Sequence, residues 1–91
     1  MAVIEKKIWP EFFKEVKKGK IRIEIRLADF HVEEGDDLVL KEWNPKKKEF
    51  TGKKVKFKVK KVYRVPEDLI RFYPLHLLKK HGVYVMELER K

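Results

Sequence analysis

Apolar and polar side chains alternate strictly along residues 20–27. The apolar positions are Ile21, Ile23, Ile25 and Leu27, and the polar positions between them are Lys20, Arg22, Glu24 and Arg26. Successive side chains of a β-strand point to opposite faces, so this alternation predicts a strand. We expect its apolar face to pack in the core and its polar face to be either solvated surface or a binding site.

Proline and glycine positions predict the helices. Pro10 suits the first position of a helix, and Gly19 suits the residue just beyond its end. A second helical stretch is predicted to begin at Pro66, to restart at Pro74 and to end at Gly82. The pattern therefore predicts two or three short helices.

Four further strands are expected, at residues 2–8, 37–43, 55–65 and 83–88. In the third of these, alternation points Val55, Phe57 and Val59 inward, and Lys61 interrupts it, which predicts a bulge. The order strand–helix–strand–strand–strand–helix–strand, with short connections, favours an α+β fold, a small mixed or antiparallel β-barrel. Because no linker or repeat interrupts the chain, we expect one domain over residues 1–91.

Composition narrows the class of protein. The chain has no cysteine and no serine, which excludes a disulfide framework, a thiolate nucleophile, a cysteine-based zinc site and a serine hydrolase. Charged residues make up 43% of the chain, as is typical of proteins from hyperthermophiles. No apolar run is long enough to span a membrane, and the N-terminus is unlike a signal peptide. We therefore expect a cytoplasmic protein, and a monomer.

The positive charge is concentrated in one segment. Residues 46–61 contain nine lysines and one glutamate, so this segment carries +8 of the formal net charge of +9. Asn44-Pro45 and Thr51-Gly52 bracket its first part and predict a hairpin with a basic tip. Lysines on a strand also protect sheet edges from aggregation, but the near absence of acidic residues here favours a polyanionic partner.

Four groups of residues, in order along residues 4–65, resemble a known family. They are Ile8-Trp9-Pro10-Glu11-Phe12-Phe13, Gly19-Lys20 with Glu24-x-Arg26, Val32 with Gly35-Asp36-x-Leu38-x-Leu40, and Glu42-Trp43-Asn44-Pro45 with Phe50-Thr51-Gly52. Together they resemble the ASCH domain, close to its small branch of domains of unknown function within the PUA-like superfamily. The resemblance implies a PUA-like β-barrel, a cleft beside the strand of residues 20–27, and a role in RNA binding.

The same resemblance suggests an enzyme as the alternative. A few ASCH proteins are similar to small amidohydrolases that act on acylated cytidines through a lysine and a threonine on this strand. Ile21 and Glu24 occupy those two positions here, so the match to that chemistry is incomplete. In this alternative Glu24 would act as a base on a modified nucleoside or nucleotide, and Lys20 and Arg26 would stabilise negative charge.

The proposed binding residues combine the strand with the lysine-rich segment. They are Lys20, Arg22, Glu24, Arg26, Trp43, Lys54, Lys56 and Lys58. Glu24 with Arg26 could bind a base edge and a phosphate, or could simply form an ion pair on a solvated face. The lysines would neutralise phosphates, and Trp43, at the mouth of the basic hairpin, could stack on an unpaired base.

The remaining candidates are weaker. Phe50, Tyr63 and Tyr73 could also stack on bases, although aromatic residues of a small barrel more often belong to its core. The three histidines lack metal-ligand spacing, and the dispersed glycines form no phosphate-binding loop, so we expect no metal and no cofactor. The expected partner is RNA or a nucleotide-like ligand. A third interpretation is a basic adaptor for an acidic protein.

Overall fold

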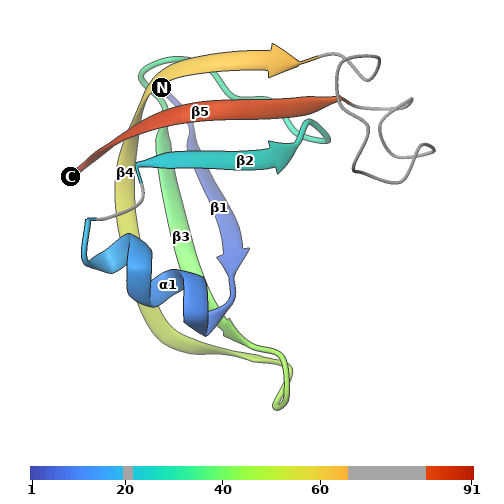
Figure 1. Ribbon diagram of the computed structural model, residues 1–91, viewed down its shortest axis with the longest axis vertical. Helices are drawn as coiled ribbons and strands as arrows, with labels where there is room; N and C mark the ends of the chain where they lie inside the picture. Colours follow the sequence, from blue (N-terminus) through green and yellow to red (C-terminus); the bar gives the residue numbers. More distant parts are fainter. Residues whose placement is uncertain (20–21, 66–81) are drawn as a thin grey trace.

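A curled five-stranded sheet and one helix make up the described part of the chain, residues 1–19, 22–65 and 82–91 of a computed structural model (Figure 1). The elements are β1 (Val3–Ile8), α1 (Pro10–Lys17), β2 (Ile23–Leu27), β3 (Asp37–Asn44), β4 (Glu49–Val65) and β5 (Val83–Arg90). The fold is therefore α+β. The helices predicted from Pro66 to Gly82 fall on residues 66–81, outside the described residues.

The strands hydrogen-bond in the order β1-β3-β4-β5-β2. β1 runs parallel to β3, and the other three neighbouring pairs are antiparallel, so the sheet is mixed as predicted. β1 and β2 lie at its two edges. The sheet curls into a half-barrel that is open between β1 and β2, rather than closing into a full barrel (Figure 1).

The long strand β4 connects the two parts of the curled sheet. Its first part pairs with β3 and its second part pairs with β5, and Figure 1 shows the strand bending between them. The register of β4 with β5 shifts between Val59 and Lys61, which confirms the predicted bulge. An extra residue in one strand increases local bending and twist. The bend allows β4 to pair with β3 along its first part and with β5 along its second part.

The core lies on the concave face of the sheet. Val55, Phe57 and Val59 are buried there as predicted, and they pack with residues of β3, β5 and α1. The largest fully buried side chains are Phe57, Leu38, Leu40, Met86, Val59 and Val83. From α1, Phe13 and Val16 complete this cluster. The helix thus covers the core that the half-barrel would otherwise expose.

Helix α1 has the predicted bounds. It begins at Pro10, and Gly19 follows its end with a φ of 77°, a left-handed conformation that glycine adopts without steric cost. The Gly19 N–H donates to the carbonyl oxygen of Val16 at 3.0 Å. No helix among the described residues is long and apolar enough to cross a membrane.

The prediction for the inward face of residues 20–27 is wrong where the strand is described. Ile23 and Ile25 are 56% and 52% exposed. Glu24 and Arg26 instead share the concave face with their partners on β5, Met86 and Tyr84. Alternation specifies which side chains share a face, but not which face points inward. At this sheet edge the concave side holds a cavity that admits polar groups, and β2 turns its polar face toward it.

A buried carboxylate holds the N-terminal strand to the loop before β3. Asp36 is 3% exposed and accepts hydrogen bonds from the backbone N–H groups of Ala2, at 2.9 Å, and Glu33, at 2.8 Å. These two donors lower the pKa of the Asp36 carboxyl below its usual 3.8. The ionised form of Asp36 therefore stabilises the folded chain more than the protonated form does.

We expect Asp36→Asn to lower the free energy of unfolding at neutral pH by about 1.5–3 kcal/mol, the usual worth of hydrogen bonds to a charged group. The folded-state pKa is lowered, so this stabilisation is complete above the unfolded pKa and is lost as the pH falls through the folded value. Urea unfolding should show a constant difference from wild type down to about pH 5 that shrinks below about pH 4. Exposed Asp29→Asn is the control, and a pH-independent difference would contradict the prediction.

Candidate binding cleft at the open seam

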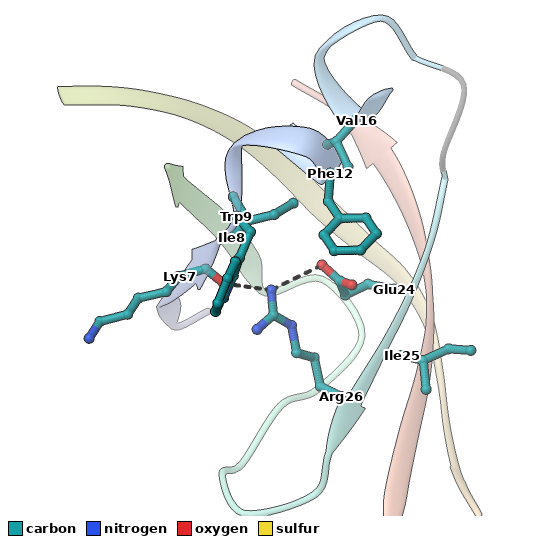
Figure 2. Close-up of a pocket in the computed structure, with 8 residues that line it drawn as sticks. All are labelled: Lys7, Ile8, Trp9, Phe12, Val16, Glu24, Ile25 and Arg26. Carbon is teal, nitrogen blue, oxygen red and sulfur yellow. Dashed lines mark hydrogen bonds and ion pairs between the residues drawn. The ribbon is translucent and has the colours of Figure 1, made fainter. Parts of the chain in front are cut away.

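One side chain bridges the open seam between the two edge strands. Arg26 of β2 donates from Nη2 to the backbone carbonyl oxygen of Lys7 on β1, at 2.8 Å. The same nitrogen lies 3.3 Å from Oε2 of Glu24, two residues earlier on β2. The guanidinium group therefore links the sheet edges and holds the Glu24 carboxylate beside them, as Figure 2 shows.

A cavity of about 510 Å³ opens at this seam. It is lined by Lys7, Ile8, Trp9, Phe12, Val16, Glu24, Ile25 and Arg26. In Figure 2 the Glu24 carboxylate points toward Phe12 and the Arg26 guanidinium, whereas the Ile25 side chain points away. Trp9 and Phe12 are 51% and 57% exposed, so aromatic surface borders the charged pair. We call this cavity the seam cleft.

The charged pair of the seam cleft is only partly hydrated. The side chains of Arg26 and Glu24 are 26% and 18% exposed. The Nε–H group of Arg26 is buried and has no hydrogen-bond acceptor among the described residues. An unsatisfied buried donor costs about 1–3 kcal/mol, which favours an acceptor supplied by a ligand or by water. The cleft thus combines guanidinium donors and a carboxylate acceptor with aromatic walls.

The structure places the predicted binding residues that it describes in three separate locations. Glu24 and Arg26 lie together in the seam cleft. Arg22 is exposed outside the cleft, in a small depression with Lys60 and Glu87. Lys20, predicted as a binding and catalytic residue, lies outside the described residues, as does Tyr73. Among the described residues, no three His, Asp or Glu side chains are grouped as a metal site would require.

Trp43 and the predicted lysines lie at the third location, on the convex face. Lys54, Lys56 and Lys58 are exposed at positions that alternate with buried core residues, so they point away from the concave face. Trp43 packs edge-to-face on Phe50, with ring centroids 4.9 Å apart. The Lys7 ammonium lies 3.9 Å from the centroid of the Trp43 ring. Of these residues only Lys7 lines the seam cleft, and Trp43 and the three lysines of β4 do not.

Two aromatic residues of the cleft were not among the predicted site residues. Trp9 directly precedes α1, and the helix carries three large apolar side chains, Phe12, Phe13 and Val16. Only Phe13 and Val16 are buried. The i, i+3 spacing of Trp9 and Phe12 places them on one side of the helix start, which is a signal of a shared surface. Whether that surface is covered depends on the tertiary structure.

A half-barrel with a polar cleft at its open seam defines the structural class, and sequence comparison supplies the family. The chain belongs to the family described as Domain of unknown function (DUF3850), whose model matches residues 3–70. The crystal structure of hypothetical protein PH0355 is similar, with a TM-score of 0.67, 24% sequence identity and full coverage of both chains. This likeness shows a shared fold. A search of curated proteins finds no significant match.

Arg26→Ala should lower the free energy of unfolding by about 1–3 kcal/mol, because it removes the link across the seam and leaves the Glu24 carboxylate unpaired. The loss should be smaller by about 0.5–1 kcal/mol when Glu24 is already replaced by Gln. Urea unfolding of the wild type, both single variants and the double variant measures this coupling. Strict additivity would show that the pair does not stabilise the seam.

Proposed function

We propose that this protein is an RNA-binding module of the ASCH, PUA-like type and that the seam cleft holds an unpaired base. The observation that carries the proposal is the Glu24–Arg26 pair, held at the open seam beside exposed aromatic side chains. A guanidinium group donates to base acceptors or phosphate, and a carboxylate accepts from amino groups of bases. Trp9 and Phe12 offer flat apolar surfaces on which a base can stack.

The family resemblance supports the same site. Glu24 and Arg26 belong to the motif by which the chain resembles the ASCH domain, whose cleft lies beside this strand. The DUF3850 match includes this strand and the β3–β4 hairpin. The proposal thus joins a resemblance in sequence to a cleft of suitable size and chemistry.

Lysines on the convex face would contribute long-range attraction. Lys54, Lys56 and Lys58 follow one another at every second position of β4, about 6.7 Å apart along the strand. None of them has an ion-pair partner among the described residues. We propose that this row and the hairpin tip attract the RNA phosphates without reading sequence, while the seam cleft makes the selective contact.

Binding accounts for the cleft better than turnover does. In the amidohydrolase-like alternative, Lys20 and Arg26 would stabilise charge while Glu24 acts as base. The Glu24 carboxylate is engaged by Arg26, which also links the sheet edges, and the position of the family's catalytic threonine is held by Glu24 itself. We therefore propose a binding module without catalytic activity.

The affinity for RNA should depend steeply on salt. If about five phosphates are neutralised, the logarithm of the association constant should fall with the logarithm of salt concentration with a slope near −3.5 to −4.5. Fluorescence anisotropy of a labelled single-stranded RNA between low and moderate salt measures this slope. An affinity that does not change with salt, or no RNA binding at low salt, would overturn the proposal.

Arg26→Ala should weaken RNA binding by at least about tenfold, since it removes the contact proposed for the cleft. Lys47→Ala removes the same unit of charge from the exposed hairpin tip and should have a smaller effect. Trp9→Ala, which leaves the charged pair in place, should also weaken binding. Circular dichroism confirms that each variant is folded. Equal losses for the Arg26 and Lys47 variants would indicate attraction by net charge alone.

A further inference from the structure

A second cavity, of about 480 Å³, lies against a different face of α1 from the seam cleft. It is lined by Pro10, Phe13, Lys14, Lys17, Lys18, Glu42 and Lys53. The lining residues of the helix follow the i, i+3, i+4, i+7 spacing of one helical stripe, whereas Phe12 and Val16 border the seam cleft. Helix α1 therefore separates two cavities. The function proposed above does not use the second one.

The second cavity contains a carboxylate that is held in place. Glu42 is 8% exposed, and its Oε1 accepts a hydrogen bond from the Thr51 hydroxyl at 2.8 Å. The hydroxyl oxygen in turn accepts from the backbone N–H of Lys53 at 3.2 Å. The other carboxylate oxygen has no hydrogen-bond donor among the described residues. The Glu42 residue is largely buried, but this second oxygen is not among the buried unpaired atoms, so it remains open to accept a hydrogen bond from a ligand in the cavity.

Cations outnumber anions in the lining of this cavity. Lys14, Lys17, Lys18 and Lys53 are exposed and surround the single carboxylate. None of them lies within ion-pair distance of Glu42 or of another described carboxylate. Glu42 therefore does not neutralise the lysines, and the cavity favours a ligand that presents both a negative group and a hydrogen-bond donor.

We propose that this cavity is a ribose-phosphate subsite, in which the lysines bind a phosphate and Glu42 accepts a hydrogen bond from the ribose 2′-hydroxyl. Carboxylates commonly bind ribose in this way, and the 2′-hydroxyl is the group that distinguishes RNA from DNA. As a statement about RNA, the proposal rests on the function proposed above. It adds a path over α1, from a base in the seam cleft to a sugar phosphate beside Glu42, and a basis for preferring RNA.

Two mononucleotides test the subsite without any RNA. Uridine 5′-monophosphate and its 2′-deoxy counterpart are titrated into the ¹⁵N-labelled full chain, and the backbone amide shifts of Phe13, Glu42 and Lys53 are followed by NMR. We expect the ribonucleotide to bind about tenfold more tightly, as one hydrogen bond to a charged group allows. Equal affinities, or shifts confined to the seam cleft, would overturn the proposal.

Two variants test whether Glu42 causes the preference for the ribonucleotide. Glu42→Gln turns an acceptor into a donor at the open position and should abolish the preference for the ribonucleotide while leaving the deoxynucleotide affinity unchanged. Thr51→Val, which removes only the hydroxyl that orients Glu42, should reduce the preference and serves if the first variant is poorly folded. An unchanged preference in both variants would overturn the role of Glu42.

A matched pair of triple variants tests the phosphate contact. Replacing Lys14, Lys17 and Lys53 by Ala should weaken both nucleotides at least about tenfold. Replacing Lys60, Lys61 and Lys91 by Ala removes the same charge from positions that line neither the seam cleft nor this cavity, and it should leave both affinities nearly unchanged. Equal losses would overturn the subsite.

The results also separate this proposal from the proposed function. RNA binding without a preference between the two nucleotides contradicts the subsite alone. A preference for the ribonucleotide without RNA binding contradicts only the proposed function.

Discussion

The hydrogen bond from Arg26 to the Lys7 carbonyl oxygen is the interaction on which the shape of the site depends. In the described part of the chain, β1 and β2 share no backbone pairing, and the Arg26 guanidinium group links them at 2.8 Å. Because the link is one side chain rather than a ladder of backbone hydrogen bonds, a cavity remains between β1 and β2. Closing the barrel with backbone pairing would satisfy the edges and would remove the space in which a ligand can bind.

Helix α1 gives the concave side its organisation. Its buried residues, Phe13 and Val16, anchor it to the core, and its two flanking sides face different cavities. The seam cleft offers a charged pair with aromatic walls, and the cavity beside Glu42 offers one open carboxylate oxygen among exposed lysines. The convex face has a different character, since its lysine row on β4 lies in the open. Selective contacts are thus expected on one face and general attraction on the other.

Much of the local structure could be predicted because its causes are local. Pro10 and Gly19 set the ends of α1, Val55 to Val59 set the inward face of β4, and Lys61 marked the bulge. The pairing of Glu24 with Arg26 also followed from their spacing, since alternate residues of a strand share a face. The aromatic walls of the cleft did not follow, because exposure of Trp9 and Phe12 depends on what the sheet leaves uncovered.

For the described residues, the sequence by itself determined helix α1, the positions of most strands and which side chains of a strand share a face, and it also shows the concentration of positive charge in residues 46–61. Only the tertiary structure decided that β2 turns Glu24 and Arg26 inward and leaves Ile23 and Ile25 exposed. It also decided that Lys54, Lys56 and Lys58 lie on the other face of the sheet from that pair. The reason is that periodicity is a property of one strand, whereas its inward direction is set by the neighbouring strand, by the curl of the sheet and by the helix packed against it.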